Sequence, residues 1–144
     1  MLVNKGLQEN YRSTVWKFLV PNTQRISRSF FDSLFLRTIS DLSNLSLIVK
    51  QDLTRLHGFA RSLPSFEALL KETEVVLCMF KVHRPDISYV QGMSHIVFFL
   101  LLHFQPRDSF VIFVNLCLNS NFLFRSITFD TNYSLAAQSL AELL

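Results

Sequence analysis

Apolar residues recur along the first 83 residues at spacings of three and four, the period at which side chains share one face of an α-helix. This pattern predicts helices over residues 7–19, over 29–38, and from Asp41 through the sequence LSLIVKQDL. A longer apolar stripe predicts a central helix over residues 64–83, with Pro64 in its first turn. The prolines at positions 21, 64, 85 and 106 stand between the periodic segments, where they begin or end helices.

The helix predicted over residues 7–19 has one apolar face. That face consists of Leu7, Tyr11, Val15, Phe18 and Leu19, with Glu9, Arg12 and Lys17 on the other side. The single tryptophan of the chain, Trp16, is expected to anchor this helix to the core.

The second half of the chain is more apolar than the first. Residues 89–104 are predicted to form a helix that is apolar almost all round and therefore buried on most sides. The sequence SFVIFVNLCL predicts a further helix capped by Asp108, although its β-branched residues leave a strand as the alternative. The last segment, NYSLAAQSLAELL, has a helical composition, with Asn132 as its cap. Residues 1–144 are thus predicted to form a single all-α domain, an irregular bundle of about six to seven helices.

Composition supports a folded chain with a large core. Hydrophobic residues make up 49% of the chain and charged residues 17%, which excludes a disordered protein. The net charge of +3 is spread without a basic block, so no nucleic-acid partner is expected. Cys78 and Cys117 each lie in an apolar run and are predicted to be buried thiols, with a disulfide between them as the alternative.

Two apolar runs, IVFFLLLHF and FVIFVNLCL, lie close together and raise the question of a membrane hairpin. A spanning helix needs about 20 consecutive apolar residues. Here polar residues and a proline divide the runs into shorter pieces, so two buried helices joined by a turn are favoured and no transmembrane segment is expected. The N-terminal sequence MLVNKGLQENYR has no apolar stretch of signal-peptide length, and a cytoplasmic location is therefore expected.

The common motifs of enzymes are missing from the sequence. It contains no glycine-rich phosphate loop, no Cys-x-x-Cys, no His-Glu-x-x-His and no Gly-x-Ser-x-Gly. His95 and His103, eight residues apart on one predicted helix, are interpreted as packing residues in preference to metal ligands. No metal site and no cofactor of its own are therefore expected.

Two short polar stretches stand out. In the first, Asp52 and Arg55 are three residues apart and can share a helix face. The second is Tyr89-Val90-Gln91-Gly92, in which one of only three glycines of the chain lies just before the longest apolar run. A glycine costs a helix about 1 kcal/mol relative to alanine, so another factor must favour it there. Each stretch also has an ordinary explanation, a surface ion pair in the first case and a solvated helix start in the second.

Read together, these stretches resemble the two fingerprints of the TBC-domain family of Rab GTPase-activating proteins. The family has Ile-x-x-Asp-x-x-Arg-Thr, then a helix and a proline turn, then Tyr-x-Gln-Gly, in the order found here. Its opening Arg-x-x-Val-Trp-x-x-Leu helix is similar to residues 12–19. The chain departs from the pattern at Val49, at Leu56 in place of Thr, and at His57-Gly58 in place of Phe-Pro.

The resemblance implies an activator that binds a GTP-loaded Rab-type small GTPase, accelerates its hydrolysis of GTP and so regulates vesicle trafficking. It implies that Arg55 is an arginine finger and Gln91 a glutamine finger, and that GTP and Mg²⁺ belong to the partner. Asp52 is expected to hold the Arg55 guanidinium, Tyr89 to pack beneath the turn, and Gly92 to permit a close approach to another surface. Such a chain catalyses no reaction alone and is expected at endomembranes only through its partner.

Family domains continue through further helices beyond the position of Leu144, so the resemblance also implies a C-terminally incomplete TBC domain. The sequences VFFLLL, FVIFV and SLAELL, which those helices would cover, are then expected to leave apolar surface exposed. The sequence leaves a second function open, a catalytically silent helical module that binds a GTPase or another partner without accelerating it. Leu56 lacks the hydroxyl of the family's threonine, which would help to fix the turn beside the arginine.

Overall fold

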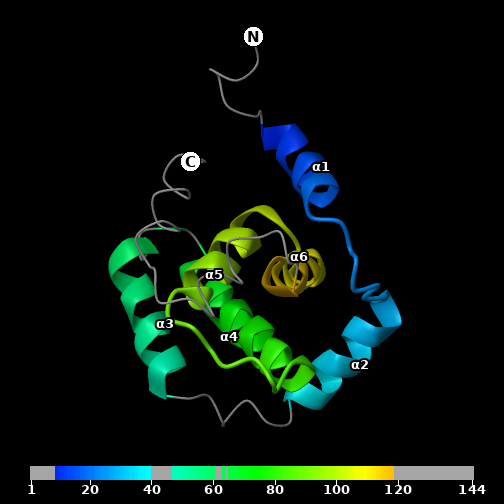
Figure 1. Ribbon diagram of the computed structural model, residues 1–144. Helices are drawn as coiled ribbons and strands as arrows, with labels where there is room; N and C mark the ends of the chain where they lie inside the picture. Colours follow the sequence, from blue (N-terminus) through cyan, green and yellow to red (C-terminus); the bar gives the residue numbers. More distant parts are fainter. Residues whose placement is uncertain (1–8, 40–46, 61–62, 64, 119–144) are drawn as a thin grey trace, which may run out of the picture.

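The computed structural model describes residues 9–39, 47–60, 63 and 65–118, and within these it is all-α (Figure 1). The helices are α1 (Glu9–Leu19), α2 (Arg28–Ile39), α3 (Leu47–Ala60), α4 (Phe66–His83), α5 (Met93–His103) and α6 (Pro106–Leu118). The prediction of an all-helical bundle is therefore confirmed. Asp41, Asn132 and the rest of the predicted last helix lie outside the described residues.

Helix α4 is the centre of the bundle, as its long apolar stripe predicts. It packs against α2, α3, α5 and α6, and Figure 1 shows α3 and α2 on opposite sides of it. The core between α4, α5 and α6 holds large side chains that are almost fully buried: Met79, Met93, Phe98, Phe110 and Phe113. Because burial of one such side chain contributes roughly 1.5–3 kcal/mol, these three helices form a rigid base for the chain segments that join them.

A polar contact fixes the segment between α1 and α2 on α6. The buried Asn115 accepts hydrogen bonds at Oδ1 from the hydroxyl of Thr23, at 2.8 Å, and from the backbone N–H of Gln24, at 3.1 Å. Its Nδ2 donates to the carbonyl of Val111 at 2.7 Å. Since a buried amide without partners would be unfavourable, these bonds hold the connecting segment in one position.

Three expectations about the helices need correction. Helix α5 begins at Met93 and not at residue 89, so the residues before it form a separate turn. Asp108 lies in the first turn of α6, which begins at Pro106, and is not its cap. The strand considered for residues 109–118 is wrong, because the whole segment is helical.

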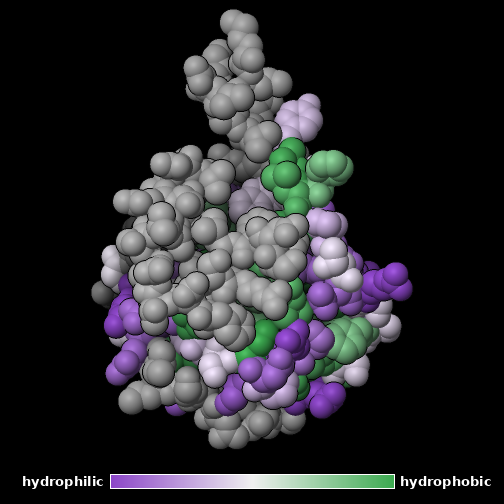
Figure 2. Space-filling model, in the orientation of Figure 1, coloured by the Kyte–Doolittle hydropathy of each residue, from purple (hydrophilic) through white to green (hydrophobic). Residues whose placement is uncertain are grey.

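The predicted apolar face of the first helix is only partly buried. Trp16 contacts Phe104 edge to face, with ring centroids 6.4 Å apart, as expected of an anchor. Phe18 and Leu19, by contrast, are 83% and 61% exposed. Figure 2 shows apolar side chains at the surface around α1, in the upper right of the view. Exposed apolar side chains also occur on α2, at Phe30, Phe35, Leu36 and Ile39. Of the segments expected to leave apolar surface uncovered, residues 97–102 do so at Phe99 and Leu102. The expectation is wrong for residues 110–114, which are largely buried because α6 packs against α4 and α5, and residues 139–144 lie outside the described residues.

The two cysteines are both free thiols, so the alternative of a disulfide is wrong. Cys78 is buried in the core, and Cys117 is partly buried at the end of α6. Burial raises the pKa of the Cys117 thiol to about 12, against a smaller opposing effect of Arg84. The Cys117 thiol is therefore protonated at neutral pH, and it packs as a small apolar residue.

Among the residues that the structure describes, no helix combines the length and the apolar character needed to cross a lipid bilayer.

Candidate functional site

The site begins with the turn that leads from α4 to α5. After α4 ends at His83, the guanidinium of Arg84 donates two hydrogen bonds to the carboxylate of Asp86, at 2.8 and 2.6 Å. The chain then runs without helical structure to Val90, whose carbonyl accepts a hydrogen bond from the N–H of Met93 at 3.1 Å. This bond closes a tight turn with Gln91 and Gly92 at its centre, directly before α5.

The carboxylate of Asp52, on α3, is the centre of the site. Asp52 is only 1% exposed. One oxygen, Oδ1, accepts a hydrogen bond from Nη1 of Arg55 at 3.1 Å. The other, Oδ2, accepts from the hydroxyl of Tyr89 at 2.6 Å, from the N–H of Gly92 at 2.6 Å and from the hydroxyl of Ser94 at 3.1 Å. A single buried carboxylate therefore links α3 to the turn and to the start of α5.

These contacts shift the ionisation of both acidic partners. Burial alone would raise the pKa of Asp52, but hydrogen bonds from Tyr89, Gly92 and Ser94 outweigh it and leave the pKa below the usual value. Burial, and then the hydrogen bond to Asp52, raise the pKa of Tyr89 to about 12. At neutral pH the site thus contains an ionised carboxylate and a protonated phenol.

The two predicted finger residues lie at one pocket. Its volume is about 510 Å³, and its walls are formed by Asp52, Arg55, Gln91, Gly92 and His95. The side chain of Arg55 is 54% exposed, and Gln91 is exposed as well. The fold therefore brings together a cation from α3 and an amide from the turn, 36 residues later in the chain, while leaving both accessible from outside.

All five predicted site residues thus meet in one place. Asp52 contacts Arg55 and Tyr89 contacts Asp52, as the sequence led us to expect for a support and a packing residue. Their roles in hydrolysis stay predictions, since these contacts concern the chain alone. Tyr89 does more than pack beneath the turn, because its hydroxyl donates to Asp52 and accepts a hydrogen bond from the N–H of Ser94 at 3.2 Å.

Within this chain, glycine is required at position 92 for a reason other than the expected close approach of a neighbouring helix. Its φ is +101°, a backbone conformation that residues with a Cβ rarely adopt. A Cβ at this position would meet no atom of the described residues within 4 Å, so no neighbouring helix approaches it closely. Backbone geometry, which points the N–H of Gly92 at Asp52, is therefore sufficient to require glycine here.

Substituting the two described glycines by alanine is expected to have opposite effects on stability. Gly92→Ala should lower the free energy of unfolding by about 1–2 kcal/mol, because a Cβ strains a backbone with positive φ. Gly58→Ala, in α3 with open space around the added Cβ, should raise it by about 0.5–1 kcal/mol. Urea unfolding of both variants tests this, and equal effects of the same sign would contradict the geometric explanation.

Two of the departures from the expected motif after Arg55, Leu56 and His57, pack against other side chains of the domain. Leu56 is 1% exposed and belongs to the buried cluster. His57 packs edge to face on Phe66, with ring centroids 5.0 Å apart. The position next to the arginine thus faces inwards, and Arg55 is held by the contact with Asp52 on its own helix.

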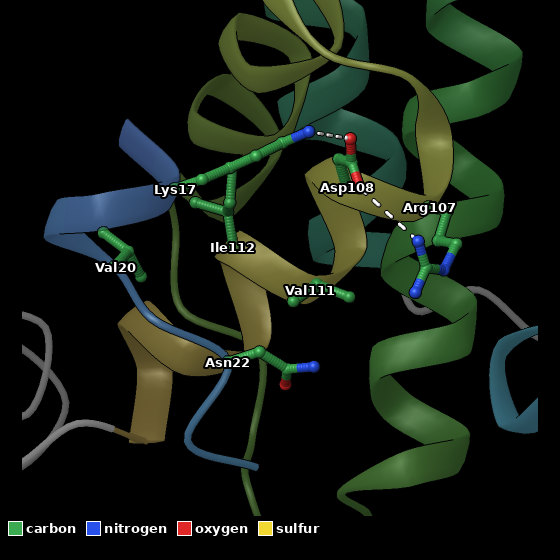
Figure 3. A pocket seen from close by; sticks show the side chains of 7 residues that line it. All are labelled: Lys17, Val20, Asn22, Arg107, Asp108, Val111 and Ile112. Atoms are coloured by element: carbon green, nitrogen blue, oxygen red, sulfur yellow. Dashed lines mark ion pairs between the residues drawn. The ribbon is translucent and has the colours of Figure 1, made fainter. Parts of the chain in front are cut away.

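A second pocket lies between α1 and α6 and has a volume of about 220 Å³ (Figure 3). It is lined by Lys17, Val20, Asn22, Arg107, Asp108, Val111 and Ile112. Nζ of Lys17 lies 2.6 Å from Asp108, and Nη1 of Arg107 lies 3.8 Å from the same carboxylate. One carboxylate compensates one of the two positive charges, and the remaining cation, near the surface, gives only a weak interaction with a charged ligand; we assign no site to this pocket.

Two further residues at the site are not predicted from the sequence to belong to it. Ser94 is fully buried and joins the carboxylate of Asp52 to the hydroxyl of Tyr89. His95 lines the pocket, and its Nδ1 lies 3.3 Å from the hydroxyl of Ser94. Their position two and three residues after the Tyr-x-Gln-Gly stretch is the signal in the sequence that points to them. Within the described part of the chain, no group of three or more His, Cys, Asp or Glu side chains is arranged to hold a metal ion.

Comparison with known proteins identifies the domain. The model of the Rab-GTPase-TBC domain matches residues 9–144. TBC1 domain family member 12 of Rattus norvegicus is 28% identical over 136 residues, which cover 78% of this chain and 19% of the relative. TBC1 domain family member 2B of Homo sapiens is 29% identical over 119 residues, covering 76% of this chain and 12% of the relative. The chain therefore spans a fifth or less of the length of these relatives, and it belongs to the Rab-GTPase-TBC domain family.

Proposed function

We propose that this chain accelerates GTP hydrolysis by Rab-type small GTPases, with Arg55 as an arginine finger and Gln91 as a glutamine finger. The observation that carries the proposal is the pocket in which both side chains are accessible, and in which Asp52 contacts both Arg55 and the backbone of Gly92 beside Gln91. Family membership supports the general class of partner.

The chemistry of phosphoryl transfer explains why these two groups suit the task. In the transition state, negative charge is spread over the oxygens of the transferred phosphoryl group, and the attacking water must be held in line. A guanidinium supplies charge and directed N–H donors, and an amide can accept from and donate to a water molecule. GTP and Mg²⁺ belong to the GTPase, so the chain itself contributes only side chains.

The contacts of Asp52 fit a site that is organised before the partner binds. Its hydrogen bond to Arg55 restricts the guanidinium, and its hydrogen bond from Gly92 fixes the turn that carries Gln91. Groups that are already positioned lose less freedom when the complex forms, which makes them more effective in the transition state. Through its partner GTPase, the chain would act in the cytoplasm at the surface of endomembranes and regulate vesicle trafficking.

A second function, binding of a GTPase without acceleration, has one observation in its favour. The guanidinium of Arg55 is paired with Asp52, a neighbour on the same helix, as in many surface ion pairs that have no catalytic role. The two functions differ in what the pocket does after the complex has formed, so measurements of binding and of hydrolysis separate them.

Single-turnover hydrolysis of GTP by a panel of Rab GTPases tests the proposal. The wild-type chain should accelerate hydrolysis by at least one GTPase, and Gln91→Ala should reduce that acceleration by about 10²–10³-fold, the usual effect of losing one positioned polar group. Gln105→Ala, an exposed glutamine between α5 and α6, is the matched control and should leave the rate unchanged.

The proposal is contradicted if a folded wild-type chain, with helical circular dichroism and cooperative unfolding, accelerates none of the GTPases. Binding of a GTP-loaded Rab by that inactive chain would favour the second function.

A further inference from the structure

His95 occupies a position in the pocket to which neither the fingerprints nor the proposed function assigns a role. It lies in the first turn of α5, is half-buried, and forms part of the same wall as Arg55 and Gln91. A partner that covers this pocket will therefore cover His95 as well.

The hydrogen bonds of Ser94 determine which ring nitrogen of His95 carries a proton. The hydroxyl of Ser94 has a single hydrogen and lies 3.1 Å from Oδ2 of Asp52, an ionised carboxylate that can only accept. Its hydrogen therefore points to Asp52, and its oxygen is left to accept. Nδ1 of His95, 3.3 Å from that oxygen, must then be the donor. This assignment follows from the hydrogen-bond network, as histidine tautomers generally do.

With the proton on Nδ1, the imidazole of His95 in its neutral form has one remaining polar atom, Nε2, which is then an acceptor. The acceptor belongs to a residue of the pocket wall, within a site that otherwise presents the cationic Arg55 and the amide of Gln91. In the described part of the chain, the hydrogen bond to Ser94 is the one recorded for the ring. A partner that buries Nε2 without offering it a donor loses affinity, because an unpaired buried acceptor is unfavourable.

We propose that His95 is a specificity-determining residue, which accepts at Nε2 a hydrogen bond from an N–H or O–H group of the GTPase surface that covers the pocket. This inference rests on the proposed function, because it names a further contact of the same site with the same partner. GTPases that place a donor opposite His95 are preferred, and GTPases with an apolar or acceptor group there are disfavoured.

Two amide substitutions separate the proposed contact of Nε2 with the partner from the contact of Nδ1 with Ser94. In His95→Asn the side-chain nitrogen can take the place of Nδ1, so the donor to Ser94 is kept and the outward acceptor is lost. In His95→Gln the terminal amide can reach the place of Nε2, so the outward acceptor is kept. His103→Asn, also half-buried and two turns later on α5, is the matched control.

The experiment measures kcat and KM for a GTP-loaded Rab that the wild-type chain accelerates. His95→Asn is expected to raise KM by about three- to tenfold with kcat retained, the effect of one lost hydrogen bond. His95→Gln and His103→Asn should stay within twofold of the wild type. A wild-type KM for His95→Asn, or a loss of kcat alone, would overturn the proposal. A larger rise in KM for His95→Gln than for His95→Asn would also overturn the proposal, since the contact of Nδ1 with Ser94 would then be the important one.

Direct binding of the GTP-loaded GTPase is measured in parallel with hydrolysis. A chain that binds but does not accelerate contradicts the activator proposal, while weaker binding of His95→Asn than of His95→Gln still supports the role of His95. A folded chain that neither binds nor accelerates any GTPase overturns both proposals. Thermal unfolding of each variant confirms that the comparison is made between folded proteins.

Discussion

Replacing Arg55 by alanine is expected to reduce the acceleration of GTP hydrolysis by about 10³-fold or more, the range in which an arginine finger acts in related GTPase systems. The substitution removes the one cation at the pocket that is both exposed and attached to the buried carboxylate of Asp52 among the described residues. Single-turnover hydrolysis at saturating concentrations of the chain measures this effect separately from any loss of affinity.

Stability should respond very little to the same substitution. Although Asp52 is buried, Arg55 is more than half exposed, so solvent screens its charge, and a screened pair on one helix contributes about 0.3–0.5 kcal/mol. Arg28→Ala, on α2, removes another exposed arginine and should leave hydrolysis unchanged. Arg55→Lys keeps the charge but not the planar fork of donors, and only partial activity is expected. Full acceleration by Arg55→Ala would remove the arginine finger from the proposed function.

Replacing Asp52 by alanine is expected to lower the free energy of unfolding by about 3–5 kcal/mol, because it removes a buried charged acceptor and leaves its donors unsatisfied. Among those donors are the hydroxyl of Ser94, which is fully buried, and the N–H of Gly92. Urea unfolding monitored by circular dichroism measures the loss. Asp32→Asn, at an exposed position of α2, is the control and should change stability by less than about 0.5 kcal/mol.

The contribution of Asp52 should also depend on pH. Its pKa is lower in the folded chain than in the unfolded one, so the ionised form stabilises the fold. That stabilisation is fully present above the unfolded pKa, at about 4, and is lost as the pH falls through the lower folded value. The difference in stability between wild type and Asp52→Asn should therefore be constant from pH 7 to about pH 5 and should shrink below about pH 4. A difference that grows on acidification would show that the carboxylate is not stabilised in its charged form.

The helices and part of the site follow from the local sequence. Spacings of three and four residues predict the elements because one helix face must be apolar, and the same geometry places Arg55 beside Asp52. The contacts of Asp52 with Tyr89, Gly92 and Ser94 join positions 37, 40 and 42 residues apart. A local sequence pattern cannot predict these contacts, because they depend on how α3 packs against α5.

The beginning of α5 shows a second reason why the sequence does not predict the whole structure. Tyr89 and Val90 suit a helix by their apolar character, yet the backbone there satisfies its polar groups through Asp52 and a tight turn. A tertiary contact has thus replaced a local preference. In the same way, the apolar character of Phe18 predicted burial, while its exposure depends on what surrounds α1. The hydrophobic pattern of the sequence predicts the helices of this domain but not which residues they contact in the fold.

Among the described residues, four groups donate to Asp52, and the N–H of Gly92 is the one backbone group of these four and belongs to no helix. Its proton can exchange with solvent deuterium only when the 2.6 Å bond to the carboxylate opens, which separates the turn of Gln91 from α3. The exchange rate of this one amide therefore measures how often the glutamine and the arginine come apart in the free protein. Binding that holds the two together would slow it, so a single NMR resonance reports on the assembly of the whole site.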